Sequence, residues 1–176
     1  MNQPEVIQAT ESDRARIRST IILAFAADPV NRWYLADPER FLKYFPQVVD
    51  VFLARSIANG GCFMTADGHG AALWFPPGTT ADEEAANAVF GEAVPEHLGE
   101  EFGEFMAGLE SYHPHDADCW YLPLIGVDPA HQGQGLGGAL MKHAISLILS
   151  LLLICGAAMH SARRSLDADL ASGQPE

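Results

Sequence analysis

A glycine-rich segment directly after an apolar stretch is the feature that most constrains how this chain can fold. Residues 120–127 read Trp-Tyr-Leu-Pro-Leu-Ile-Gly-Val and predict a strand, and residues 133–138 contain four glycines. Glycines let backbone N–H groups approach a ligand, because no Cβ stands in the way. A helix expected from Gly135 onward adds unpaired N–H donors and the positive end of its dipole. The segment therefore predicts an anion site suited to a pyrophosphate.

The glycines of residues 133–138 also fit the dinucleotide-binding pattern GxGxxG. That pattern needs an acidic partner about 20 residues further on, where residues 157–160 read Ala-Ala-Met-His. The chain that follows is also too short for the rest of a nucleotide-binding domain. Two interpretations remain, a coenzyme pyrophosphate site and an ordinary tight connection between a strand and a helix.

Local signals elsewhere predict an α/β fold rather than a bundle or a sandwich. Helix starts are expected at Ser12–Asp13 and at Asp37–Pro38, because aspartate caps a helix and proline suits its first position. The expected elements are a strand at 6–10, a helix from 12 to about 28, a helix from 38 to 59, a hairpin of strands 62–65 and 71–75, two helices in 81–110 divided by Pro95, a loop at 113–116, the strand 120–127, a turn at 128–134 and the last helix. One domain is expected over residues 1–160, with a disordered tail at 161–176.

The net charge of −13 is concentrated in the middle of the chain. No lysine or arginine lies between Arg55 and Lys142, and that span holds thirteen acidic residues. Phosphate binding needs a basic surface, so nucleic acid is not expected as a partner. A cationic substrate is attracted by such a surface, although an acidic surface also serves solubility alone.

The cysteines predict neither a disulfide framework nor a metal site. Cys62, Cys119 and Cys155 are odd in number and scattered, and none has the CxxC or CxxH spacing of a zinc site. Half-buried thiols in a reducing cytoplasm are expected instead. Residues 1–9 lack a basic region followed by an apolar stretch, so no secretory signal is expected.

The glycine segment resembles the coenzyme-A signature of the GCN5-related N-acetyltransferase (GNAT) superfamily. Gln132-x-x-Gly135-x-Gly137 follows Gly-Val-Asp-Pro in the register of that signature. Residues 24–29 and 72–77 are similar to members of the superfamily, above all to the puromycin N-acetyltransferase-like group. The resemblance implies an acyl-CoA N-acyltransferase-like mixed sheet flanked by helices. It also implies acetyl transfer from acetyl-coenzyme A to an amine of a small molecule or peptide, or else a truncated relative that binds coenzyme A without turnover.

The resemblance implies a cofactor site in two parts. Backbone groups of Ile125, Gly126 and Val127 would meet the pantetheine arm, and an N–H near Ile125 would stabilise the oxyanion. The pyrophosphate would be held by the main-chain N–H groups of Gln132, Gly133, Gln134, Gly135, Leu136, Gly137 and Gly138. The base that takes the amine proton stays open among Tyr121, His113, His115, Asp116 and Glu110, with Tyr121 the residue chosen as catalytic. Trp33, Tyr34, Trp74 and Phe75 either line an acceptor pocket or pack in the core.

The sequence departs from the superfamily pattern after Lys142. No tyrosine follows Tyr121, so the family's proton donor to the thiolate has no counterpart, and the last strands of the sheet are expected to be incomplete. A truncation or frameshift would explain that change. Residues 144–159 are uncharged and mostly apolar, but a membrane span needs about 20 such residues. A buried helix or a homodimer through residues 144–156 is expected instead.

Overall fold

The computed structural model describes residues 4–112 and 119–150. The chain divides into two compact units, Met1–Met141 and Lys142–Glu176. In the second unit, residues 142–150 are helical. The expected tail, the incomplete final strands and the loop 113–116 lie outside the described residues, and the single domain over residues 1–160 stays a prediction.

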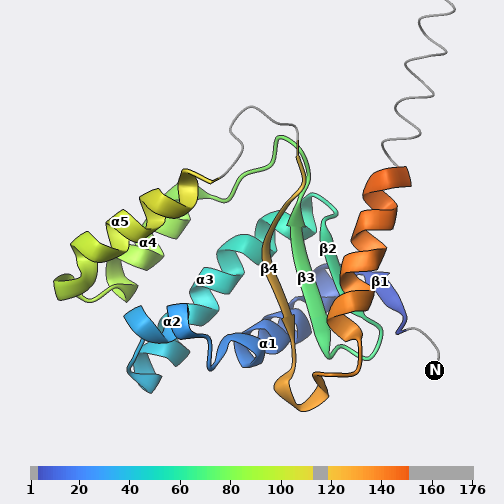
Figure 1. Ribbon diagram of the computed structural model, residues 1–176, viewed down its shortest axis with the longest axis horizontal. Coiled ribbons are helices and arrows are strands. Elements are labelled where there is room, and N and C mark those ends of the chain that lie inside the picture. The colour runs from blue at the N-terminus through green and yellow to red at the C-terminus, as the bar shows by residue number, and fades with distance from the viewer. Residues whose placement is uncertain (1–3, 113–118, 151–176) are drawn as a thin grey trace, which may run out of the picture. The chain divides into compact units, whose positions relative to one another are not determined.

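A four-stranded sheet in the order β1-β2-β3-β4 organises the first unit (Figure 1). Its strands are β1 (Val6–Gln8), β2 (Cys62–Thr65), β3 (Gly70–Phe75) and β4 (Tyr121–Val127). All three pairings are antiparallel. The register sets Gly70 opposite Val127, so the turn between β2 and β3 meets the end of β4. The expected hairpin and the expected strand before the glycines are confirmed.

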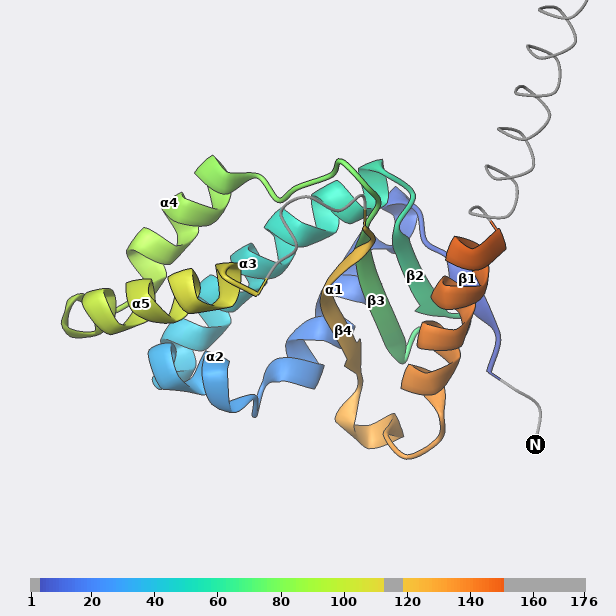
Figure 2. The same cartoon turned by 45° about the horizontal axis from the view of Figure 1, so that its top comes forward.

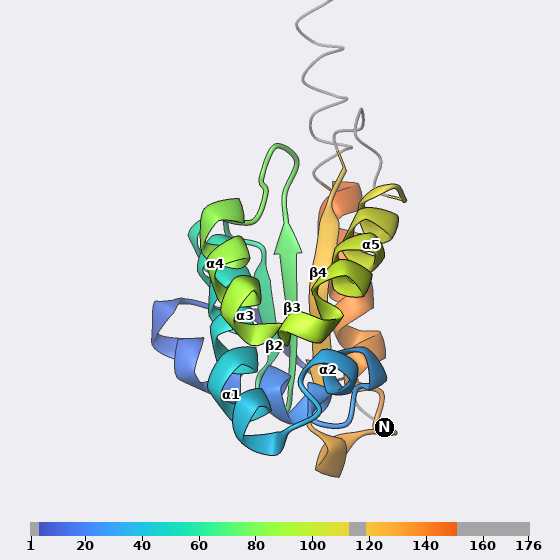
Figure 3. The ribbon, with the colours of Figure 1, turned by 90° about the vertical axis from the view of Figure 1, so that its left-hand side faces the viewer.

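Helices α1 (Arg14–Phe25) and α3 (Pro38–Ala58) cover one face of the sheet, as the view along its edge shows (Figure 3). Asp37 caps α3, because its carboxylate accepts the Arg40 N–H at 2.9 Å. The core between α3 and the sheet contains the fully buried Phe45, Val49 and Leu73. This layer holds β3 and β4 in place from one side.

The helix expected to run to Asp28–Pro29 ends earlier, and that expectation is wrong. Helix α1 stops at Phe25, and a further helix α2 (Pro29–Tyr34) begins where the first was expected to stop. Asp28 caps α2 by accepting the Asn31 N–H at 2.9 Å. Aspartate followed by proline is the same start signal that opens α3, so at Asp28 it marks the start of a new helix and not the end of the preceding one.

Two further helices lie beyond α3, away from the sheet (Figure 2). They are α4 (Glu83–Ala93) and α5 (Gly99–Glu110), separated by the short 3-10 helix η2 (Glu96–Leu98) that follows Pro95. This confirms the expected division at Pro95. Phe102 of α5 packs at a tilt against Phe90 of α4 and Tyr34 of α2, with ring centroids 5.4 and 5.0 Å away. Aromatic packing therefore joins α5 to α2 and α4.

Candidate functional site

The segment after β4 is a short 3-10 helix followed by an exposed loop. Asp128 caps the 3-10 helix η3 (Pro129–His131) by accepting the Ala130 N–H at 3.0 Å. Residues 132–135 are exposed, and Gly133 and Gly135 have φ angles of 77° and 82°, which favour glycine. The Gln132 side chain donates to the Val127 carbonyl at 3.2 Å and closes the loop. The loop expected between strand and helix is therefore present.

The helix that follows the loop begins with free backbone donors. Its first intrahelical hydrogen bond runs from the Ala139 N–H to the Gly135 carbonyl at 2.9 Å. The N–H groups of residues 136–138 therefore precede the intrahelical ladder. A Cβ built at Gly133, Gly135 or Gly138 would meet no atom within 4 Å. Open space, free N–H groups and a helix N-terminus fit a pyrophosphate.

Strand β4 provides the second part of the expected cofactor site. It is the last strand in the sheet order, so within the described chain its outer edge has no strand partner. In an antiparallel pair, alternate backbone groups point away from the partner strand. Residues 125–127 pair with β3 on one side, and on the other side the stretch presents outward backbone groups, of which the Val127 carbonyl already accepts the Gln132 side chain. Such an edge fits an extended, amide-containing arm, because amides pair with backbone N–H and C=O groups.

Gly126 has a packing role that sequence reasoning did not assign. A Cβ at this position would lie 2.6 Å from the Ala24 Cβ and 3.2 Å from the Ile21 Cδ1, both on α1. Helix α1 therefore approaches β4 too closely for any side chain here. The glycine allows the helix to seat on the strand that carries the proposed pantetheine edge.

Tyr121 begins β4, and its environment suits a proton donor better than a base. Burial of the ring raises the pKa of Tyr121, and the negative charge of Glu110 raises that pKa further. A phenol with a raised pKa keeps its proton at neutral pH. The ring is 40% exposed, so a substrate can reach it. Glu110 ends α5 and is exposed, which leaves it as the described carboxylate candidate for the base. His113, His115 and Asp116 lie outside the described residues.

The four aromatic residues considered for an acceptor pocket do not form one. Tyr34, Trp74 and Phe75 are buried at 4%, 7% and 2% exposure. Trp33 and Tyr34 pack against Phe102, whereas Phe75 packs against Phe52 and Tyr121. They belong to separate packing clusters, so the core interpretation holds and the pocket is withdrawn.

One more sequence expectation is wrong, and another stays a prediction. Cys62 is buried but Cys119 is exposed, so the thiols are not uniformly half-buried, and Cys155 lies outside the described residues. No metal ligands were expected, yet His69, Asp128 and His131 come together next to the glycine loop, residues 132–138. The sequence hides this group, because His69 is far from the others in the chain. The only sequence signal for this group is a histidine in the expected hairpin turn. The register of β3 with β4 must be known before that histidine can be placed beside Asp128 and His131.

No helix in the described ranges, 4–112 and 119–150, is long and apolar enough to cross a membrane.

Comparison with known proteins agrees with the fold and with the loop. The sequence model of the Acetyltransferase (GNAT) family matches residues 72–163, more than half of the chain. A solved Corynebacterium glutamicum protein, described as histone acetyltransferase HPA2 and related acetyltransferase, has a TM-score of 0.59 and 24% identity, covering 82% of this chain and 71% of that one. A mosquito arylalkylamine N-acetyltransferase-like 5b protein has a TM-score of 0.44 and 14% identity, covering 84% and 71%. The first likeness confirms the expected α/β fold, and the family match, which includes β4 and the whole glycine loop, shows that the chain belongs to the acetyltransferase (GNAT) family.

Proposed function

We propose that this protein binds acetyl-coenzyme A along β4 and the glycine loop and transfers the acetyl group to a cationic amine of a small molecule or peptide. The observation that carries the proposal is the loop itself, with open space at its glycines and N–H donors at residues 136–138. The family uses acetyl-coenzyme A as co-substrate, which agrees with these features. The cofactor residues remain those expected from the sequence, Ile125 to Val127 and Gln132 to Gly138.

The reaction needs one group that accepts a proton and one that donates a proton. Glu110 takes a proton from the ammonium of the acceptor, directly or through water, and the free amine attacks the thioester carbon. A backbone N–H near Ile125 stabilises the oxyanion that forms. When the C–S bond breaks, the thiolate takes the proton of Tyr121, and the phenolate recovers a proton from the amide nitrogen. One proton is released overall, to Glu110.

The acidic surface of α4 and α5 supports a cationic acceptor. Eight glutamates on α4, η2 and α5 are exposed, and this part of the chain contains no lysine or arginine. They are Glu83, Glu84, Glu92, Glu96, Glu100, Glu101, Glu104 and Glu110. An accumulation of one charge raises the local concentration of the opposite charge and its association rate. Because Glu110 is one of these residues, the field leads an ammonium toward the proposed base.

The test is release of coenzyme-A thiol from acetyl-coenzyme A across a panel of amines. The panel contains puromycin, a basic peptide and a neutral amine. Puromycin is included because residues 24–29 and 72–77 resemble the puromycin N-acetyltransferase-like group, and the peptide because one structural relative is described as a histone acetyltransferase. Turnover with a cationic member supports the proposal. Acetyl-coenzyme A binding without thiol release from any amine would identify a non-catalytic relative.

The role of the acidic surface is tested separately. The triple variant Glu100→Gln, Glu101→Gln, Glu104→Gln should lower kcat/KM for a cationic amine and leave it unchanged for a neutral amine. Added salt should reduce the difference, because it screens exposed charges beyond about 10 Å at 0.1 M. Equal losses for both amines would show that these residues act through the fold and not through their charge.

A further inference from the structure

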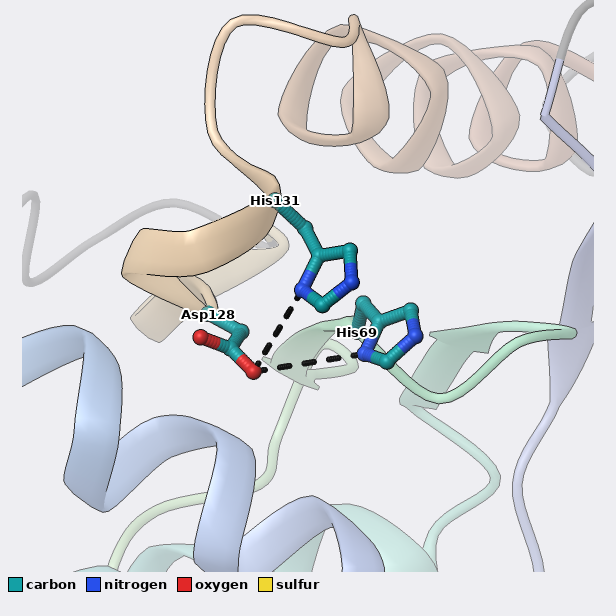
Figure 4. A group of neighbouring side chains, drawn as sticks. All are labelled: His69, Asp128 and His131. Atoms are coloured by element: carbon teal, nitrogen blue, oxygen red, sulfur yellow. Dashed lines mark ion pairs between the residues drawn. The ribbon is translucent and has the colours of Figure 1, made fainter.

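Three side chains of metal-ligand type meet where the turn between β2 and β3 touches the start of the glycine loop (Figure 4). His69 comes from the turn, and Asp128 and His131 come from η3 and its cap. The Nδ1 atoms of His131 and His69 lie 3.5 and 4.0 Å from Oδ2 of Asp128. One ligand atom from each of the three residues lies within 4.8 Å of the other two. All three residues belong to the same compact unit.

Backbone hydrogen bonds hold the three residues in this arrangement. The Asp128 N–H donates to the His69 carbonyl at 2.8 Å, and the His131 N–H donates to the Asp128 carbonyl at 2.8 Å. Oδ1 of Asp128 accepts the Ala130 N–H, which leaves Oδ2 facing the two imidazoles. The site is therefore prepared before any ligand enters, as metal sites with good affinity require.

The turn that carries His69 is fixed as well. The Asp67 carboxylate accepts the His69 N–H at 3.0 Å and the Thr65 hydroxyl at 2.6 Å. From α1, Thr20 donates its hydroxyl to the Gly68 carbonyl at 2.8 Å. These contacts leave the imidazole of His69 as the part of the turn that is free to adjust to a ligand.

One nitrogen in the group lies within ion-pair distance of Asp128 but makes no hydrogen bond with the described residues. Nδ1 of His131 is buried and makes no hydrogen bond within the described part of the chain. Buried polar atoms are satisfied in native proteins, and a missing ion is one of the established reasons for an exception. The imidazole rings of His69 and His131 are parallel within 8°, with centroids 3.5 Å apart. Both rings turn Nδ1 toward the same carboxylate oxygen (Figure 4).

We propose that His69, His131 and Asp128 bind one divalent transition-metal ion of the zinc class, through Nδ1 of each imidazole and one oxygen of Asp128. Zinc takes nitrogen and carboxylate ligands at about 2.0–2.2 Å, so ligand atoms around it stand roughly 3.3–3.5 Å apart. The separations of 3.5 and 4.0 Å are close to that spacing, and the two stacked rings must turn out of their parallel planes so that the Nδ1 lone pair of each points at one ion. The side chains are between 22% and 33% exposed, so an ion can enter.

The ion would join the hairpin turn to the entry of the glycine loop. Asp128 follows β4 directly, and His131 precedes Gln132 directly. With three protein ligands, zinc keeps a coordination position for water or another donor. The proposal is independent of acetyl transfer, because it concerns binding of the ion and not turnover.

The test is titration of the full chain with Zn²⁺ alone, after removal of metal with a chelator, followed by calorimetry and thermal unfolding. One equivalent should bind and raise Tm. His69→Ala, His131→Ala and the conservative Asp128→Asn, which keeps an oxygen to cap η3, should each weaken binding roughly tenfold or more and reduce the rise in Tm. Co²⁺ should give a visible spectrum with the wild type that these variants lack.

Two control variants remove histidines elsewhere. His97→Ala, in η2, and the pair His113→Ala with His115→Ala should bind Zn²⁺ as the wild type does. The proposal is wrong if the wild type binds no Zn²⁺, if all three ligand variants bind it as tightly as the wild type, or if the His113 and His115 pair accounts for the binding. Circular dichroism identifies a variant that has not folded, and the remaining ligand variants then decide.

Discussion

Gly126→Ala should destabilise the protein through overpacking between β4 and α1. The new Cβ would lie 2.6 Å from the Ala24 Cβ, far inside contact distance, and that neighbour cannot rotate away. Adding one carbon to a packed interior costs about 1–3 kcal/mol when the backbone must shift. The free energy of unfolding, measured by urea denaturation, should fall by that amount.

The matched control for this variant is Gly103→Ala on α5. A Cβ at Gly103 meets no atom within 4 Å. Alanine in place of an unpacked helical glycine should stabilise by about 0.5–1 kcal/mol. The two variants add the same atom and should change stability in opposite directions. Equal changes in both variants would refute the close approach of α1 to β4.

Three further predictions concern proton transfer, pH and assembly. Tyr121→Phe should lower kcat with little change in KM, and an unchanged kcat would exclude Tyr121 as the proton donor. Because burial and Glu110 raise the pKa of Tyr121, wild-type activity that depends on its proton should persist up to a pH of about 10 or above. Burial raises the pKa of the Cys62 thiol from 9.0 to about 12, so the contribution of the neutral thiol to stability is fully present below pH 9.0 and is lost as pH rises. Between pH 8 and pH 10, the free energy of unfolding in urea should therefore fall by about 1 kcal/mol more in the wild type than in Cys62→Ala. Parallel losses in the two proteins would contradict the burial. Ile145 and Leu149 are 47% and 55% exposed, so light scattering should show a dimer of the wild type. The double variant Ile145→Lys, Leu149→Lys should be a monomer. A wild-type monomer at high concentration would contradict the predicted dimer.

Elements with strong local signals were predictable from the sequence. The cap at Asp37, the turn between β2 and β3, and the glycine loop each depend on residues close together in the chain, and all are present. Asp28 shows the limit of such signals, because aspartate before proline occurs where one helix has ended and another begins. The packing of Trp33 and Tyr34 against Phe102 gives α2 its place in the fold.

Features that depend on register or on distant packing were not predictable. The group at His69 and His131 exists because Gly70 lies opposite Val127 in the sheet. The environment of Tyr121 likewise depends on burial and on Glu110, which belongs to another element. A sequence pattern names residue types with suitable chemistry, but distances between elements decide which of them act together.

The central claim, that the glycine loop binds the pyrophosphate of acetyl-coenzyme A, is tested most directly by calorimetry with Gly138→Glu. A Cβ at Gly138 meets no atom within 4 Å, and its φ is not in the left-handed region, so this variant avoids the strain expected at Gly135. A glutamate in the first helical turn does not weaken the helix, because it complements the dipole. The matched control, Gly103→Glu, places the same side chain on open α5 surface.

The account predicts one acetyl-coenzyme A bound per wild-type chain and unchanged affinity in Gly103→Glu. Two unit charges about 4 Å apart repel by about 1 kcal/mol in water and about 4 kcal/mol near a protein surface, so Gly138→Glu should bind from several-fold to about a thousand-fold more weakly. Equal affinity in Gly138→Glu and the wild type would contradict the assignment of the pyrophosphate to this loop.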